Sequence, residues 1–304
     1  MTASDIIWGL DIGGTKCAAI AGTREGKILF RQAMPTKGHP WQEMIDLLVG
    51  MIPEEYRHPT AVGVSCGGPL NSVTGMILSP PNLPGWDEVP IVQYLTEKLH
   101  VPAFVQNDAD ACALAEWKLG AGKGTRHMIY LTFGTGMGAG LILNGQLFSG
   151  ACGMAGETGH VRLEHDGPWG FGKNGSFEGF CSGGGIAKLC KMRLGVEYSC
   201  KELCEMADAG DENALSVLNE SARMLGRGLA MLMDLFNPEK IIIGSIFARA
   251  ERYFRTPALE VAQREALPYT FDACQVVPAA LGDQIGDYAA LAIAINGLER
   301  MENP

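Results

Sequence analysis

The chain has 304 residues, of which 47% are hydrophobic and 19% charged, and its formal net charge is −10. This length predicts two lobes, and this composition is typical of a globular protein. The acidic charge disfavours nucleic acid as a partner. No apolar run reaches the roughly 20 residues that span a membrane, and the chain does not begin like a signal peptide. We therefore expect a cytoplasmic protein with no membrane partner, and nine cysteines without a C-x-x-C pair fit reduced thiols there.

The first part of the chain predicts short strands separated by turns and helices. An antiparallel meander is expected at 6–10, 17–21 and 27–31, then a helix at 44–49 and strands at 61–65 and 103–106. A proline-rich loop at 78–86 carries Asn82. Asp108 lies where the last strand meets a helix at 109–119, and helix N–H groups favour its ionised form there. An ordinary capping aspartate is the alternative interpretation.

The second part begins with a strand-turn-strand at 129–140 and continues into a glycine-rich stretch at 150–185. That stretch predicts a long loop without helix or strand, and such loops are commonly functional. Helices follow at 186–192, 201–207, 214–236, 248–266 (broken by Pro257) and 287–300, with strands at 241–244 and 274–277. This alternation predicts an α/β fold.

Two glycine-rich turns, within residues 7–16 and 129–140, indicate a phosphate site. Glycine lets backbone N–H groups approach a ligand, and successive N–H groups bind anions. Either turn alone could be a plain hairpin, but two together would hold a chain of phosphates. Neither is a P-loop or a dinucleotide fingerprint. Asp11 lies inside the first turn, where it suits phosphate only with a cation between them. The sequence thus predicts a site that binds a nucleotide together with Mg²⁺.

These segments together resemble the ROK family of sugar kinases, within the actin/hexokinase/Hsp70-like ATPase fold. The resemblance covers almost the whole chain and rests on segments that follow one another at compatible spacing. They are the phosphate motifs at 11–16 and 134–138, the catalytic-aspartate element at 107–109, the E-x-G-H sequence at 157–160, the sugar-side loops at 67–69 and 81–83, and the adenosine-side segments at 237–244 and 281–283.

The resemblance implies a two-lobed, ribonuclease H-like α/β fold: duplicated mixed β-sheet domains flanked by helices, with a central cleft. The lobes are expected at 1–112 plus 285–304 and at 113–284, the second also carrying a homodimer interface. The implied activity is ATP- and Mg²⁺-dependent phosphorylation of a hexose at its C6 hydroxyl, with glucose as the first candidate. Closure of the lobes would exclude water.

The resemblance also implies roles for individual residues. Asp108 would be the general base, and Asp11 would lie near Mg²⁺, through water. Lys16 would neutralise phosphate charge or lie solvated outside the turn. The sugar would be bound by Gly68, Asn82, Asn107, Asp108, Glu157, His160 and Glu178. The nucleotide would be bound by Asp11, Gly13, Gly14, Thr15, Lys16, Gly134, Thr135, Gly136 and Gly244.

The chain departs from the family pattern at two places. The zinc motif of the family aligns with residues 169–178, where Trp169, Phe171 and Ser176 replace its three cysteines. Structural zinc needs four ligands, so we expect no zinc, with His160 free for the sugar and the two aromatic residues bracing the loop. Asp110 replaces a usual asparagine.

Several alternatives remain. Within the kinase class the acceptor could be an N-acyl hexosamine (N-acetylmannosamine or N-acetylglucosamine) or fructose, because specificity depends on loop geometry. The family also includes sugar-responsive repressors, but those carry an N-terminal helix-turn-helix domain, whereas the first phosphate motif here starts close to Met1. A silent sugar-binding protein is the third class, and retention of Asp108 disfavours it.

Overall fold

The computed structural model describes residues 6–36 and 39–303, which form two compact units. The first unit extends to Lys123 and also takes in Ser149–Met154 and the C-terminal segment from Asp283. The second contains Gly124–Phe148 and Ala155–Gly282. Among the helices of the described residues, none combines the length and apolar character that crossing a bilayer requires.

The first unit keeps helix α3 (Asp108–Leu119) whole, because α3 packs against α10 (Ile285–Glu302) of the same unit. The division expected at residue 112 falls inside this helix, whereas the unit continues to Lys123. The expected boundary lies close to the strand-to-helix junction at Asp108, whereas the end of the unit depends on which elements pack together.

The sheet of the first unit has the strand order β3-β2-β1-β4-β7. Its strands are β1 (Ile6–Ile12), β2 (Lys16–Thr23), β3 (Ile28–Pro35), β4 (Val62–Cys66) and β7 (Ala103–Asn107). The first three form an antiparallel meander, and β4 and β7 add in parallel on the other side of β1. The predicted meander is therefore confirmed.

The sheet of the second unit repeats this topology in the order β10-β9-β8-β13-β14. Its strands are β8 (Met128–Leu131), β9 (Ala139–Leu143), β10 (Gln146–Leu147), β13 (Lys240–Ile243) and β14 (Gln275–Pro278). Again three strands form a meander and two add in parallel beside the first. The expected duplicated α/β fold is confirmed.

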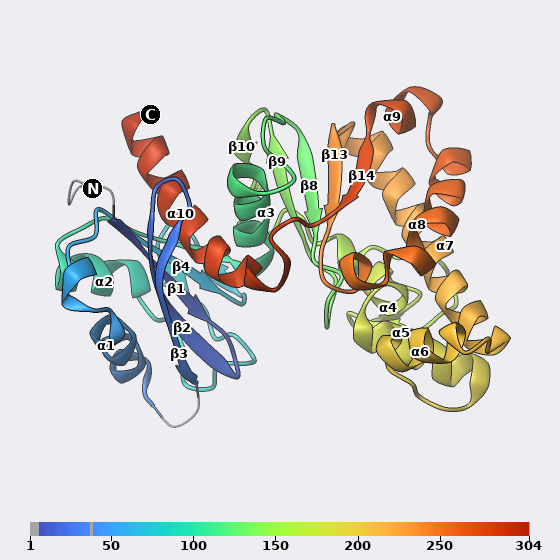
Figure 1. Ribbon diagram of the computed structural model, residues 1–304, viewed down its shortest axis with the longest axis horizontal. Coiled ribbons are helices and arrows are strands. Elements are labelled where there is room, and N and C mark those ends of the chain that lie inside the picture. Colours follow the sequence, from blue (N-terminus) through green and yellow to red (C-terminus); the bar gives the residue numbers. More distant parts are fainter. Residues whose placement is uncertain (1–5, 37–38, 304) are drawn as a thin grey trace. The chain divides into compact units, whose positions relative to one another are not determined.

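Two layers of helices cover the first sheet, and strand alternation decides which side chains meet which layer. Trp8, Leu10 and Ile12 of β1 pack with the buried residues of α1 (Trp41–Met51) and α2 (Ile91–Leu99). Ile7, on the opposite face of β1, packs with α10. Figure 1 shows α10, in red, running across this sheet. Asp11 shares the parity of Ile7, so it faces the α10 side.

The contact of α10 with the sheet is unusually close, because glycines stand where side chains would collide. A Cβ on Gly63 of β4 would lie 2.1 Å from the carbonyl oxygen of Ala290, and one on Gly9 of β1 would lie 2.8 Å from the Ala290 Cβ. The helix presents small residues at this contact, including Ala290 and Ala294. Glycine on the strands and alanine on the helix thus set the depth at which α10 sits.

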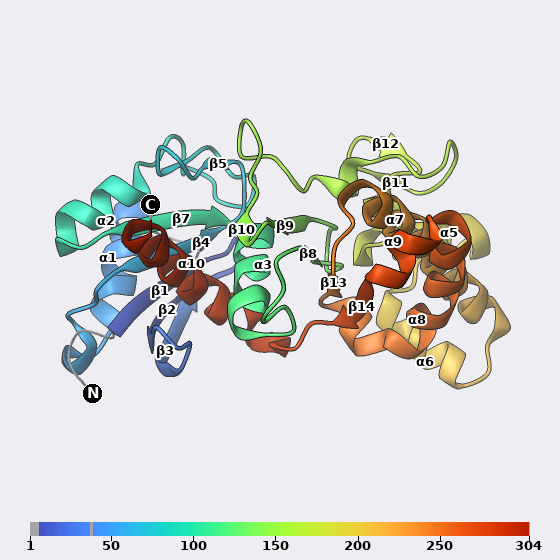
Figure 2. The same ribbon diagram turned by 90° about the horizontal axis from the view of Figure 1, so that it is seen from above.

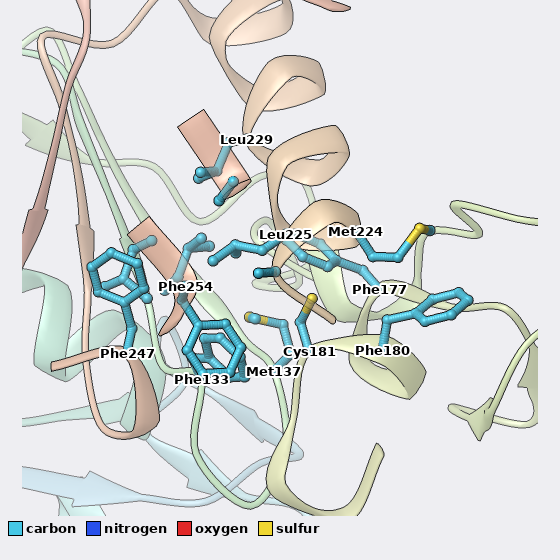
Figure 3. Close-up of a cluster of buried hydrophobic side chains, with 14 of the residues drawn as sticks. Phe133, Met137, Phe177, Phe180, Cys181, Met224, Leu225, Leu229, Phe247 and Phe254 are labelled. Atoms are coloured by element: carbon cyan, nitrogen blue, oxygen red, sulfur yellow. The ribbon is translucent and has the colours of Figure 1, made fainter. Parts of the chain in front are cut away.

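The second unit buries a larger core beneath its helices. These are α4 (Phe177–Phe180), α5 (Gly183–Leu194), α6 (Cys200–Asp208), α7 (Glu212–Phe236), α8 (Ile246–Glu265) and α9 (Pro268–Ala273). Figure 3 shows Phe133, Phe177 and Phe254 among the side chains of this core. The rings of Phe133 and Phe254 lie edge to face, 5.2 Å apart and at 82°, a favoured aromatic geometry.

The glycine-rich stretch at 150–185 is more ordered than predicted, so the expectation of a loop without helix or strand is wrong. It contains the 3₁₀ turn η3 (Thr158–His160), the hairpin β11 (Trp169–Gly170) and β12 (Lys173–Asn174), helix α4 and the start of α5. Figure 2 shows the hairpin beside the helices of this unit. Serine caps explain the helices: Ser176 Oγ accepts the Gly179 N–H at 3.0 Å and Ser182 Oγ the Gly185 N–H at 2.9 Å.

The predicted helix break at Pro257 is also wrong. Helix α8 continues through Pro257, and its one non-helical residue is Ala250. Proline removes a backbone donor, but α8 is held along α7 beside this position. A Cβ on Gly226 of α7 would lie 2.3 Å from the Ala258 carbonyl oxygen. Packing therefore keeps the proline inside the helix.

The remaining short elements connect these layers. They are η2 (Glu54–Tyr56), β5 (Leu70–Asn71), β6 (Met76–Ile77) and η4 (Gly282–Gln284). β5 and β6 pair antiparallel and directly precede the proline-rich loop that carries Asn82.

The close contact of α10 generates a stability prediction. Gly63→Ala forces a methyl group against backbone, so we expect the free energy of unfolding to fall by at least about 2 kcal/mol. Gly50→Ala in α1 is the matched control, since nothing lies within 4 Å of its added Cβ, and it should stabilise the protein by about 0.5–1 kcal/mol. Urea unfolding measures both. Equal effects of the two substitutions would contradict the packing argument.

Candidate functional site

The first glycine loop joins β1 to β2 and is braced by Thr36. The Gly13 N–H donates to the Lys16 carbonyl at 3.1 Å, which closes the turn. Thr36 donates through Oγ1 to the Gly13 carbonyl at 2.6 Å and through its N–H to the Thr15 carbonyl at 3.0 Å. The loop is therefore held from its carbonyl side, while Thr15 and Lys16 are exposed.

Asp11 lies in a crowded electrostatic environment at the end of β1. Burial, followed by the negative charges of Asp287 and Asp108, raises its pKa to about 6 from the ordinary 3.8, against the opposing charges of Lys16 and Arg31. Asp287, at the start of α10, is itself buried and paired with Arg31 at 2.7 Å. A carboxylate whose charge is disfavoured in this way would gain from a divalent cation, so Asp11 fits a place beside Mg²⁺.

Asp108 is the first residue of α3, directly after β7. Asn107 caps the helix: its Oδ1 accepts the Asp110 N–H at 2.8 Å and its Nδ2 donates to Asp110 Oδ2 at 3.3 Å. Asp108 Oδ1 accepts the Ala109 N–H at 2.9 Å. Desolvation by the surrounding chain raises the pKa of Asp108 despite this hydrogen bond, yet solvent still reaches its side chain. The carboxylate is thus a strengthened base that a substrate can reach.

These residues share one hollow in the first unit, with a volume of about 150 Å³. A Cβ on Gly14 would lie 2.7 Å from the Asn82 Cβ, so the glycine loop and the proline-rich loop touch at its rim. The hollow joins segments far apart in sequence. Six of the residues predicted from the sequence line it: Asp11, Gly13, Gly14, Gly68, Asn82 and Asp108.

The second glycine loop, between β8 and β9, is fixed at the start of α5. The Gly134 N–H donates to the Gly136 carbonyl at 2.9 Å, and the Gly183 N–H donates to the Gly134 carbonyl at 2.8 Å. Gly134 and Thr135 line a cavity of about 750 Å³ inside the second unit. Helix α6 and the first two turns of α8 form other walls, which carry Lys201, Arg249 and Arg252 as well as Glu205 and Asp208.

Three predicted ligand residues of the second unit, Gly136, Gly244 and Glu178, do not line this cavity and have structural contacts instead. Gly244 is buried, and a Cβ there would lie 2.3 Å from the Tyr130 hydroxyl; its neighbour Ser245 lines the cavity. Glu178 Oε2 accepts the Met137 N–H at 3.0 Å and lies over Gly136. Glu178 therefore supports the second glycine loop.

Glu157 directly precedes the η3 turn and His160 is its last residue, and both are exposed. The His160 ring meets the Phe171 ring at 5.3 Å, edge to face. Lys173 Nζ lies 3.0 Å from His160 Nδ1 and 2.9 Å from its carbonyl oxygen. An ammonium can only donate, so Nδ1 accepts and the ring proton is assigned to Nε2. No local sequence pattern predicts that Lys173 contacts His160.

The segment that replaces the zinc motif is held by serine and backbone. Ser176 is fully buried, donates to the Gly170 carbonyl at 2.9 Å and caps α4. Trp169 is 54% exposed, so the expectation that it braces the loop is wrong, while Phe171 contacts His160. Across residues 6–36 and 39–303, no group of three or more His, Cys, Asp or Glu side chains is placed to hold a metal ion.

Sequence reasoning missed α6 as a wall of the larger cavity. The sequence does indicate where α6 begins, because Ser199 and Glu202 form a capping box. Ser199 Oγ accepts the Glu202 N–H at 3.2 Å, and Glu202 Oε2 accepts the Ser199 N–H at 2.7 Å. The motif marks where the helix starts, but nothing in it indicates a cavity.

The raised pKa of Asp11 generates a prediction for stability. The unfolded chain releases this proton near pH 4 and the folded protein near pH 6, so stability falls across that window and the penalty is complete above it. A shift of about two units corresponds to about 3 kcal/mol. Asp11→Asn should therefore raise the free energy of unfolding at pH 7.5 by about 1–3 kcal/mol in EDTA, and flatten its dependence between pH 4 and 6.

Asp46→Asn is the matched control for that measurement. Hydrogen bonds from Tyr94 and Lys98 lower the pKa of Asp46, so the same chemical change there should reduce stability above pH 4. A less stable Asp11→Asn protein at pH 7.5 would contradict the electrostatic account of Asp11.

Comparison with known proteins places the chain in a family. Residues 7–296 match the model of the ROK family. A glucokinase of Halalkalibacterium halodurans is 32% identical over 302 residues, 91% of this chain and 91% of that protein. An N-acetylmannosamine kinase of Escherichia coli O9:H4 is 31% identical over 259 residues, 84% and 88% of the two chains. A ROK family glucokinase from Streptomyces griseus, solved in complex with glucose and AMPPNP, shares 30% identity, with a TM-score of 0.74 over 95% of this chain and 99% of that one. The chain therefore belongs to the ROK family.

Proposed function

We propose that this protein is an ATP-dependent hexose kinase that transfers the γ-phosphoryl group of ATP to the C6 hydroxyl of a hexose, with glucose as the acceptor. The observation that carries the proposal is the hollow of the first unit. It joins an accessible carboxylate of raised pKa, Asp108, to the amide of Asn82 and to the first glycine loop. A base, a hydrogen-bonding amide and backbone N–H groups are what this transfer requires.

The relatives support this assignment. The glucokinase of H. halodurans and that of S. griseus, whose structure holds glucose and AMPPNP, match this chain over nearly its full length. Residues 11–16, 107–109 and 157–160 of this chain keep the family's sequence at its phosphate, catalytic and sugar elements.

Asp108 would act as the general base. As the sugar oxygen bonds to the γ-phosphorus and the bond to ADP breaks, the hydroxyl proton passes to the carboxylate. Oδ1 is engaged by the Ala109 N–H, so we assign the proton to Oδ2. Asn107 acts indirectly, because its side chain caps α3 and thereby orients Asp108.

Each unit carries its own groups that suit a nucleotide. The cavity of about 750 Å³ in the second unit is within the range of small-molecule sites. Lys201 and Arg249 in its lining suit phosphates, whereas Arg252 is paired with Asp208. When bound, Mg²⁺ neutralises the charge that develops on the transferred group. Asp11 would contact its hydration shell, and Gly13, Gly14 and Thr135 would hold phosphate oxygens. A homodimeric state and a cytoplasmic location stay predictions.

One relative favours a second acceptor. The N-acetylmannosamine kinase of E. coli matches this chain at nearly the same identity as the glucokinases, so an N-acyl hexosamine is the alternative substrate. Both hypotheses use the same base and nucleotide cavity and differ in the group at the second sugar carbon.

The proposed activity is tested by sugar-dependent ADP release. Glucose, mannose, fructose, N-acetylglucosamine and N-acetylmannosamine are compared with ATP and Mg²⁺, and phosphorus NMR locates the phosphate on the product. We expect turnover with glucose and phosphate on C6. Turnover with N-acetylmannosamine alone would favour the alternative acceptor, and no turnover with any sugar would overturn the kinase assignment.

Asp108→Asn tests the base. The amide keeps the size of the side chain but accepts no proton, so kcat should fall by about 10²–10⁴-fold with little change in the KM of the sugar. Asp110→Asn, the same change two residues away, is the control and should keep kcat within about threefold, because its oxygen still accepts from Asn107. Equal activity of Asp108→Asn and the wild type would exclude Asp108 as the base.

Lys173→Met tests whether the lysine positions His160. Without the charge-assisted hydrogen bond from Lys173, the His160 ring is no longer held in one tautomer. The KM of the sugar should therefore rise about tenfold while kcat stays within about threefold. Lys188→Met is the control, since Lys188 of α5 donates to the carbonyl of Trp169, in the hairpin that also carries Lys173, at 2.8 Å. An unchanged KM in Lys173→Met, or the same rise in both variants, would contradict this role.

A further inference from the structure

Two cysteines lie in the wall of the large cavity of the second unit. Cys200 is the first residue of α6 and Cys204 follows one turn later, so both thiols lie on one face of the helix. Both line the cavity with Thr135 of the second glycine loop and Ser245 at the start of α8. No role proposed above uses either thiol.

We propose that Cys200 and Cys204 form a nucleophilic thiol pair in the nucleotide cavity, a modification site at which soft electrophiles and low-molecular-weight disulfides couple to Cys204 and block nucleotide. The part concerning nucleotide rests on the function proposed above. The thiol pair itself rests on the helix and its surroundings.

The two thiols are hydrogen-bonded to each other, and this bond polarises them in opposite directions. The Cys200 S–H donates to the Cys204 sulfur, which lowers the pKa of Cys204, with further help from the charge of Arg252. Burial and the carboxylates of Asp208 and Glu205 oppose the shift. Donation to Cys204 and burial raise the pKa of Cys200, although Arg249 works against this. Of the two thiols, Cys204 is therefore the one that loses its proton first.

Other cysteines of the chain have a different environment. Burial raises the pKa of Cys66 and of Cys274 to about 12, so both are expected to be inert. Cys152 is exposed and serves as a reference for ordinary thiol reactivity. Cys204 is also buried, but it differs because its pKa is lowered and because it lines a cavity that a small molecule can enter.

The helix also decides what the pair can form. Side chains four residues apart on a helix have Cβ atoms about 5–6 Å apart, whereas a disulfide needs about 3.5–4.5 Å. A bond between Cys200 and Cys204 is thus disfavoured. With a disulfide R–S–S–R, the Cys204 thiolate attacks one sulfur, the S–S bond breaks, a mixed disulfide forms and RS⁻ leaves. Cys200 keeps its proton throughout.

The first test measures alkylation of each cysteine in the full-length protein by iodoacetamide, with peptide mass spectrometry. The Cys204–carbon bond forms as iodide leaves. We expect Cys204 to react at least tenfold faster at pH 7 than Cys66 or Cys274, with a rate–pH midpoint below the ordinary value of about 8.5. Cys200→Ala should slow Cys204 at least threefold at pH 7 and raise this midpoint, whereas Cys152→Ser should change neither. Reaction of Cys204 no faster than that of Cys66, or an unchanged rate in Cys200→Ala, would overturn the thiol pair.

The second test adds ADP with Mg²⁺ and then oxidised glutathione. ADP should slow alkylation of Cys204 at least fivefold and leave Cys152 unchanged. Oxidised glutathione should abolish most ADP release, dithiothreitol should restore it, and Cys204→Ala should keep its own starting activity under the same treatment. Wild-type activity that survives complete modification of Cys204 would overturn the block of nucleotide. Turnover of the untreated protein reports the kinase function separately, so a failure of either proposal is distinguishable from a failure of the other.

Discussion

The close approach of α10 to strands β1 and β4 is the constraint on which the first unit depends. Gly9 and Gly63 leave no side chain between helix and sheet, and Ala290 fills the space. This depth brings the start of α10 to the end of β1, where a Cβ on Gly286 would lie 2.9 Å from Asp11 Oδ2. The packing of α10 against the sheet therefore brings Asp287 close enough to repel Asp11. This repulsion is one reason why Asp11 suits a place beside a cation.

The same strand topology serves different purposes in the two units. In the first, the glycine loop is combined with carboxylates and an amide around a small hollow. In the second, the glycine loop opens onto a larger cavity, whose walls from α6 and α8 carry both basic and acidic side chains. A duplicated scaffold thus supplies two glycine-rich turns, for which we propose phosphate binding, and the segments inserted around each turn determine which other side chains lie beside it.

Much of this organisation could be predicted from the sequence. The strand meanders, the junction at Asp108 and the glycine loops have local signatures, and the ROK resemblance ordered them into one fold. Lys173, Asp287 and the α6 wall could not be predicted in this way, because their roles arise from contacts between segments distant in the chain. Pro257 and the stretch at 150–185 show the same limit: packing against α7 retains one helix, and the serine caps of α4 and α5 create others.

The most direct test of the central claim is a crystal structure of the protein with glucose and a non-hydrolysable ATP analogue. We expect the C6 hydroxyl to lie within about 2.6–3.2 Å of Asp108 Oδ2, with Asn82 in contact with the sugar and the analogue in the cavity lined by Thr135 and Ser245. A sugar bound in the first unit with its C6 hydroxyl turned away from Asp108, or bound elsewhere, would contradict it.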